Sequence, residues 1–257
     1  MSFGTDFYYN DRWSHELGVS IAKINNDFAT SKFLPDKEII EEQIPFRDQP
    51  YYFGARREPL SFSFLLTCVD DEWTLEKRRE IARWLDTDDF ALFYTEKDPE
   101  KRYYCQYAGG IDLHYNWASR GFIEITMRLN TTHAFSPFMT KEIYSVDGFD
   151  PAIDRNEDVA NHGDSVAYPE LWIQMNEDGD VHIENLSAGG VELNVVGLLK
   201  DENLYIDMND GFVESDFPHG FRYENMSGDF FLDRGVNRVL LKGNFELLIR
   251  WQGSIKG

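Results

Sequence analysis

The alternation of apolar and polar residues predicts β-strands arranged around one helix in the first half of the chain. In the stretch WTLEKRREIARWL, residues 73–85, apolar side chains recur at the spacing of a helix that buries one face. Leu75, Ile81, Ala82 and Leu85 form that face, and Thr74 is placed to cap the first turn with its hydroxyl. Arg78 projects into the same apolar stripe. It either lays its methylenes on the core or offers its charge to a neighbouring subunit.

Period-two alternation marks the strands on both sides of this helix. In residues 60–68 every second side chain is apolar, which is typical of a strand with one buried face. After the helix, the short apolar run at residues 90–94 predicts a buried strand. Further strands are predicted at residues 102–107, 111–115 and 122–129.

The pattern changes between residues 131 and 167, where periodicity fades and an acidic stretch follows Pro151. Beyond it, short alternating segments separated by turns rich in Gly, Asn and Asp predict an antiparallel sandwich. The sequence therefore predicts a mainly β protein with one main helix. Its expected parts are an N-terminal domain at residues 1–136, a connecting segment at 137–167 and a C-terminal β-sandwich at 168–257.

Residues 33–57 interrupt the N-terminal domain with an apolar excursion. Pro35, Pro45 and Pro50 forbid a long helix there, so we expect an extended arm or hairpin. An arm this apolar must pack on its own domain or on the next subunit. With Arg78, its large apolar residues are the candidate oligomer interface: Ile39, Ile44, Phe46, Tyr51, Tyr52 and Phe53.

Composition narrows the possible functions. The 257 residues carry a formal net charge of -21, which argues against a protein that binds nucleic acid tightly through Lys and Arg. An acidic surface suits a conduit through which DNA slides without sticking, although acidity also simply keeps a protein soluble. No stretch approaches 18 continuous apolar residues, so no membrane association is predicted.

No motif for catalysis or for cofactor binding is present. The six histidines show no metal-binding spacing, and phosphate-binding glycine loops and nucleophile elbows are absent. Asp154, Asn156 and Asp158 are spaced like the start of a calcium loop, but Val159 stands where that loop needs glycine. Acidic clusters flank the helix at a separation of roughly 20 Å, too far apart for paired catalytic carboxylates. We therefore predict no enzyme activity, no cofactor and no metal.

The order of these features resembles the distal tail proteins of long-tailed phages, which are hub components of siphophage tail tips. The N-terminal stretches that carry the resemblance are IPFRDQPYYFG, EPLSFSFLL, REIARWL, FALFYTEKDPEKRYYCQY and GFIEITMRLNTTHAFSP. The C-terminal stretches are PELWI, VHIENLS, LYID and GVNRVLLKG. Together they span nearly the whole chain.

The resemblance implies a virion protein of the phage tail tip, made in the host cytoplasm. Its N-terminal domain would form a hexameric ring through which phage DNA passes, with residues 33–57 as a belt on the neighbouring protomer. Its C-terminal domain would be a galectin-like sandwich outside the ring. Implied partners are the tail tube protein, a tail-associated hub, lysin or fibre protein, a receptor-binding protein and the tape measure protein. The alternative function is a carbohydrate-recognition sandwich that binds cell-surface glycans.

Overall fold

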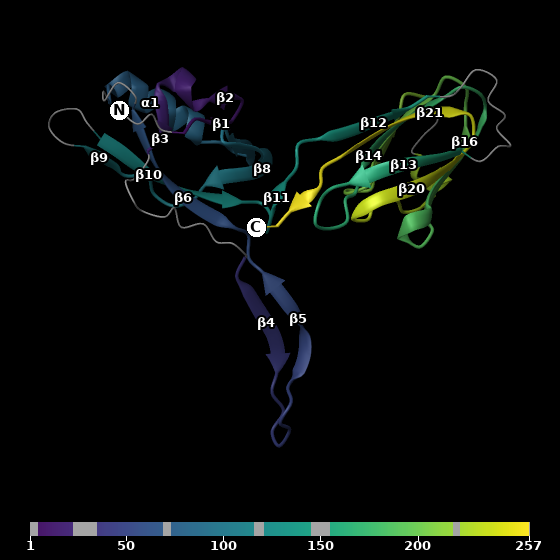
Figure 1. The fold of residues 1–257 in the computed structure, drawn as a ribbon, viewed down its shortest axis with the longest axis horizontal. Helices are drawn as coiled ribbons and strands as arrows, with labels where there is room; N and C mark the ends of the chain where they lie inside the picture. The colour runs from purple at the N-terminus through teal and green to yellow at the C-terminus, as the bar shows by residue number, and fades with distance from the viewer. Residues whose placement is uncertain are drawn as a thin grey trace. The chain divides into compact units, whose positions relative to one another are not determined.

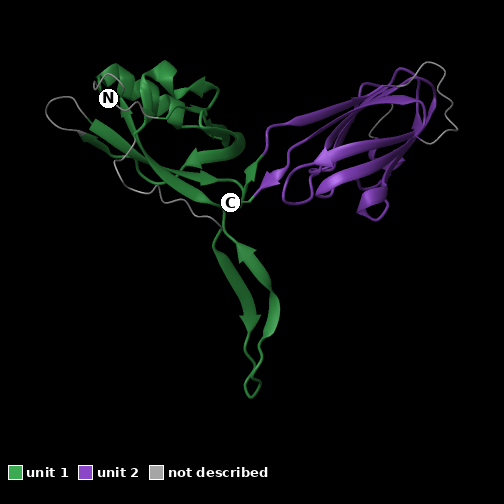
Figure 2. Ribbon diagram, viewed as in Figure 1, with its two compact units in different colours: residues 1–135, 256–257 green, residues 136–255 purple. Residues whose placement is uncertain are grey.

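The computed structural model describes residues 5–22, 35–68, 73–115, 121–144, 155–217 and 222–256 of the chain. It divides into two compact units, coloured separately in Figure 2. The first unit comprises residues 1–135 with 256–257, and the second comprises residues 136–255. The prediction of a mainly β protein with one main helix is confirmed.

The first unit is built on a curved antiparallel sheet (Figure 1). Its strands follow the order β2-β1-β7-β8-β10-β6-β3, while β9 pairs with β10 and β11 with β8. A short 3₁₀ helix, η1 (Ser14–Leu17), precedes β3. The strands of this sheet are β1 (Phe7–Tyr9), β2 (Arg12–Trp13), β3 (Val19–Ile21), β6 (Ser61–Cys68), β7 (Ala91–Thr95), β8 (Asp98–Tyr107), β9 (Leu113–Tyr115), β10 (Gly121–Leu129) and β11 (Ala134–Phe135).

The pairing of β10 with β6 explains why the alternation in the sequence predicted these two strands. Ile125 lies opposite Phe64, and Ile123 lies opposite Leu66, so the apolar faces of both strands coincide. Ile123, Ile125 and Leu66 are all buried in the core of this unit. Cys68 and Cys105 lie buried in the same core and are not joined by a disulfide.

The helix α1 (Leu75–Leu85) covers this core and begins where the sequence predicts. Thr74 Oγ1 accepts a hydrogen bond from the backbone N–H of Lys77 at 3.2 Å. Ile81, Trp84 and Leu85 are buried, whereas Leu75 and Ala82, both expected in the buried stripe, are exposed, Leu75 at 65%. The indole N–H of Trp84 donates to the Tyr9 carbonyl at 2.7 Å, which lets the large ring be buried without an unpaired donor.

The second unit is the predicted antiparallel β-sandwich. One sheet has the order β12-β21-β14-β17-β18 and the other β13-β20-β15-β16-β19. Their strands are β12 (Met139–Ile143), β13 (Arg155–Asn161), β14 (Glu170–Met175), β15 (Gly179–Asn185), β16 (Val191–Leu198), β17 (Asn203–Asp207), β18 (Phe212–Ser215), β19 (Met226–Gly228), β20 (Gly235–Lys242) and β21 (Phe245–Trp251). Shorter elements complete the unit: η2 (Leu186–Ala188), η3 (Arg222–Asn225) and β22 (Ser254–Ile255).

The stretch expected to connect the two domains, residues 137–167, contains two of these strands. β12 pairs with β21 in one sheet, and β13 pairs with β20 in the other. The hydrophobic pattern misses β13 because one of its inward positions is Asn161. The Asn161 amide is satisfied by donating to the carbonyls of Ser165 and Leu232, at 2.9 and 3.1 Å, so a polar residue is tolerated in the core.

A buried ion pair and a tight glycine contact also hold the second unit together. The carboxylate of Glu202 accepts two hydrogen bonds from the Arg222 guanidinium, at 2.7 and 2.5 Å, and both residues are buried. At another point the chain passes itself so closely that a Cβ added to Gly163 would lie 2.7 Å from the Cα of Gly253. The Asp164 N–H donates to the Ser254 carbonyl beside this crossing.

Candidate functional site

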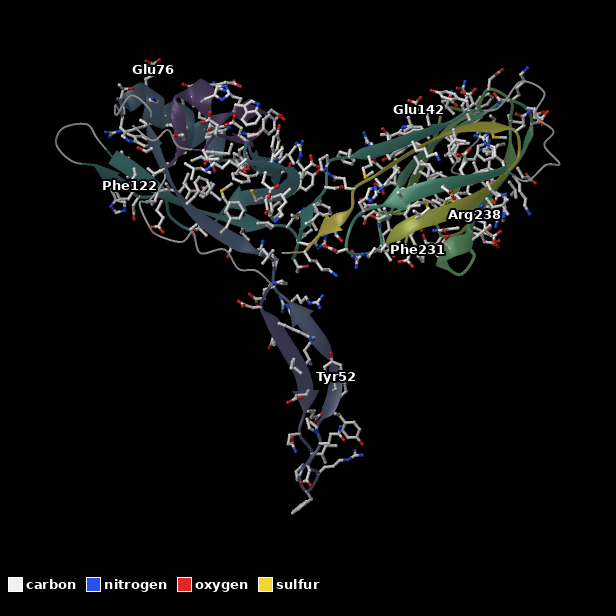
Figure 3. All side chains as sticks on the ribbon, viewed as in Figure 1. Tyr52, Glu76, Phe122, Glu142, Phe231 and Arg238 are labelled. Carbon is white, nitrogen blue, oxygen red and sulfur yellow. The ribbon has the colours of Figure 1, made fainter. Side chains whose placement is uncertain are left out.

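The candidate site is a hairpin arm formed by β4 (Lys37–Glu42) and β5 (Tyr51–Arg57) in the first unit. The two strands form a sheet of their own, and their neighbours in the described part of the chain are only one another. The arm leaves the main sheet at a narrow base, where the Glu58 N–H donates to the Asp36 carbonyl at 3.1 Å. Figure 3 shows Tyr52 on this arm.

The six apolar residues predicted to contact a neighbouring subunit are all exposed on this arm. Ile39 is 57% exposed, Tyr52 64% and Phe53 66%. The other three are exposed as well: Ile44, Phe46 and Tyr51. This apolar surface therefore does not pack on the described part of its own domain. That it contacts a neighbouring subunit stays a prediction. Residues 33 and 34 of the predicted arm lie outside the described residues.

A tight turn presents Phe46 at the tip of the arm. The Arg47 N–H donates to the Ile44 carbonyl at 3.2 Å, which closes a four-residue turn with Pro45 at its second position. Phe46 occupies the third position with a φ of 70°, a left-handed conformation that turns of this kind usually reserve for glycine. Its ring is fully exposed, at 108%. A bulky residue is held in a costly conformation at the most accessible point of the arm.

Other contacts order the arm locally. The Arg47 guanidinium lies over the Tyr51 ring, 4.6 Å from its centroid, and the Gln43 side chain donates to the Arg47 carbonyl at 2.6 Å. The pairing register shifts between Ile40 and Glu41, which is a β-bulge, and Gly54 has a φ of 138° there. These contacts shape the hairpin, but they cover little of its apolar surface.

Arg78, the seventh predicted interface residue, is not part of this cluster. It lies on α1 and is half-buried, at the edge of a cavity of about 380 Å³ in the first unit. Trp73, Ile81 and Tyr107 line the same cavity. Its assignment to an interface between subunits stays a prediction.

The residues considered for metal binding and catalysis do not form a site in the described part of the chain. Asn156 and Asp158 belong to β13, and Asp154 lies outside the described residues. Asp86 is the residue that follows the last turn of α1, where its N–H donates to the Ala82 carbonyl at 3.0 Å. Among the described helices, none is long and apolar enough to cross a bilayer.

Comparison with known structures identifies the fold. The chain superimposes on the SPP1 Dit (gp 19.1) protein, described as a paradigm of the hub adsorption apparatus in phages that infect Gram-positive bacteria, with a TM-score of 0.70. That match covers 98% of this chain and 100% of the other, at 12% sequence identity. A chain of the phage p2 baseplate in its activated conformation matches with a TM-score of 0.53 and 9% identity, over 96% of this chain and 98% of that one.

Sequence comparison agrees with this fold. A SPbeta prophage-derived uncharacterized protein of Bacillus subtilis (strain 168), YomH, is 22% identical over 255 residues, which is 96% of each chain. Residues 3–131, just over half of the chain, match the family described as the phage tail protein N-terminal domain. The resemblance to distal tail proteins is therefore confirmed in family and in fold, and the chain belongs to this family of phage tail proteins.

Proposed function

We propose that the protein is a structural hub of the phage tail tip, in which six copies form a closed ring through their first units. The arm of each protomer docks on the next protomer, and phage DNA passes through the central channel. The ring joins the tail tube to the tail-associated protein below it. This role requires no catalytic step and no cofactor.

The exposed arm is the observation that carries this proposal. Soluble monomers rarely leave so many large apolar side chains on one projecting element, and a two-stranded hairpin alone in water is marginally stable. An arm that leaves one subunit and docks on a different surface of the next makes a heterologous contact, which closes into a ring when the rotation fits. The Dit-like fold supports the tail-tip location, and the net charge of -21 suits a channel for DNA.

Excising the arm tests the proposal. The Asp36 carbonyl and the Glu58 N–H are hydrogen-bonded, so residues 37–57 can be replaced by two glycines without stretching the main sheet. Six copies of the 30.0 kDa chain correspond to a particle of about 180 kDa in analytical ultracentrifugation or mass photometry. We expect the full chain to form this particle, and the excised chain to sediment as a monomer that still shows a cooperative thermal unfolding transition. A ring of unchanged mass without the arm would refute the proposal.

A further inference from the structure

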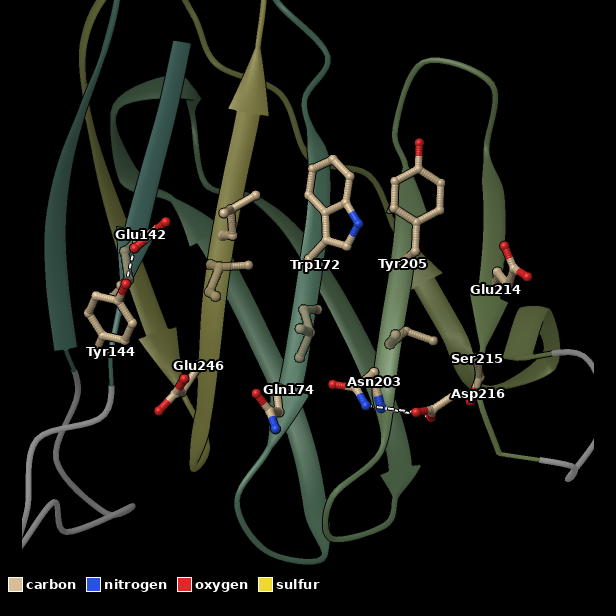
Figure 4. A pocket seen from close by; sticks show the side chains of 15 residues that line it. Glu142, Tyr144, Trp172, Gln174, Asn203, Tyr205, Glu214, Ser215, Asp216 and Glu246 are labelled. Atoms are coloured by element: carbon tan, nitrogen blue, oxygen red, sulfur yellow. Dashed lines mark hydrogen bonds between the residues drawn. The ribbon is translucent and has the colours of Figure 1, made fainter. Parts of the chain in front are cut away.

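A cavity of about 480 Å³ lies on the outer face of the sheet β12-β21-β14-β17-β18 in the second unit (Figure 4). The strand register places its floor in two rows that cross the sheet. In the first row, Trp172 lies between Leu248 and Tyr205, and the ring centroids of Trp172 and Tyr205 are 5.0 Å apart. Glu142 pairs with Leu248 at one end of the row, and Glu214 pairs with Tyr205 at the other. The row is an aromatic platform with a carboxylate at each end.

The second row is polar throughout. Gln174 lies between Glu246 and Asn203 on the neighbouring strands, and the Asn203 side chain donates to Asp216 at 2.7 Å. Glu214 and Glu246 make no hydrogen bond or ion pair with the described residues, so their carboxylates face the cavity uncompensated. The residues that line it, all within the described ranges, include four carboxylates and no Lys, Arg or His.

Arg250, at the edge of the same face, is an example of a guanidinium bound by aromatic rings and a carboxylate on this sheet. Its guanidinium lies 4.7 Å from the centroid of the Trp172 ring and 4.8 Å from that of Phe138, and it forms an ion pair with Glu170. A planar cation is thus held between aromatic faces and a carboxylate. The cavity shares the Trp172 ring with Arg250 and adds the Tyr205 ring and further carboxylates, while its own lining residues include no cation.

We infer that this cavity binds an arginine-bearing peptide segment of a partner protein. The four carboxylates repel an anionic ligand. A neutral ligand would take water from them without supplying a compensating charge, which costs free energy. A guanidinium can stack on the Trp172 and Tyr205 rings and pair with Glu214 or Glu246, because its fork of N–H donors matches a carboxylate. Burial, together with the neighbouring Glu170 carboxylate, raises the pKa of Tyr205 to about 12.

The test measures fluorescence anisotropy of a labelled pentapeptide, Gly-Arg-Gly-Arg-Gly, with the full-length protein at 0.15 M salt. The matched probe replaces both arginines by citrulline, which has nearly the same shape without the charge. We expect the arginine peptide to bind saturably and the citrulline peptide at least about tenfold more weakly. The double variant Glu214→Gln, Glu246→Gln should weaken arginine-peptide binding by about tenfold as well.

A chain with a net charge of -21 attracts any basic peptide weakly, so the control must remove the same charge elsewhere. Glu192→Gln with Glu224→Gln does this at exposed positions outside the cavity, and we expect its affinity to stay within about twofold of wild type. Equal losses in the two double variants, equal binding of both peptides, or no binding would overturn the inference. So would saturable binding of a neutral oligosaccharide such as maltoheptaose that Trp172→Ala abolishes. The result is independent of ring formation, which the excised arm reports separately.

Discussion

Substituting Phe46 by alanine isolates the contribution of the arm tip to assembly. The ring is fully exposed in the single chain, so its removal takes nothing from the folded monomer. Burying a phenylalanine side chain in an interface stabilises that interface by about 1.5–3 kcal/mol. Each interface of the proposed ring should therefore weaken roughly 10- to 150-fold in its dissociation constant.

The closed geometry enlarges this effect. A subunit that leaves a ring breaks two interfaces, so Phe46→Ala should make its departure easier by about 3–6 kcal/mol. We expect sedimentation velocity across a range of protein concentrations to show the 180 kDa particle of wild type replaced by smaller species at concentrations where wild type remains assembled. The melting temperature of the dissociated chain should not change, because no intramolecular contact is lost.

A matched substitution shows whether the effect is specific. Phe212→Ala removes an exposed phenylalanine of the second unit, which is 47% exposed and lies outside the proposed ring-forming unit. It should leave the sedimentation profile unchanged. An unaltered profile for Phe46→Ala, or the same loss of assembly in both variants, would refute the assignment of the arm tip to the interface.

Two further predictions concern the stability of the second unit. Burial alone would raise the pKa of Glu202, but hydrogen bonds from Arg222 and Ser215 hold it below its ordinary value. This ion pair therefore adds stability at pH above the unfolded pKa of about 4.3, and that stability is lost as the pH falls through the lower folded pKa. Glu202→Gln should lower the free energy of unfolding in urea at pH 7 by about 3–5 kcal/mol and flatten its dependence on acid pH; an unchanged midpoint would contradict this. Gly163→Ala should cost about 1–3 kcal/mol, because the added methyl group meets the backbone at Gly253, and a wild-type melting temperature would show that the chain relaxes freely there.

The local sequence pattern was sufficient to predict a helix or a strand where that element buries one regular face. The helix cap at Thr74 and the alternating faces of β6 and β10 depend on neighbours in sequence, so they were predictable. The strand β13 was not, because Asn161 is acceptable in the core only through carbonyls supplied by distant residues. The exposure of Leu75 was not predictable either, because the tertiary structure decides which part of the apolar stripe the sheet covers.

The candidate interface likewise has some features that the sequence predicts and others that it does not. The proline spacing and apolar content of residues 33–57 predict an arm, and the hairpin of β4 and β5 is the observed form. The left-handed conformation of Phe46 could not be predicted, since phenylalanine rarely adopts it and only the closed turn reveals it. The cavity over Trp172 was also missed. It depends on the register of neighbouring strands, which brings together residues far apart in the sequence.

The isolated hairpin leaves two sheet edges unpaired in the described part of the chain, and their charges decide which edges can pair between copies. Both outer edges of a free two-stranded sheet can add further strands without limit, which is the route to fibrils. On β4, the apolar pair Ile39 and Ile40 is flanked by Glu38, Glu41 and Glu42, so two copies of this edge repel each other when they approach. The carboxylates therefore oppose pairing between two β4 edges, whereas β5 carries Arg56 and Arg57 and is not repelled by them.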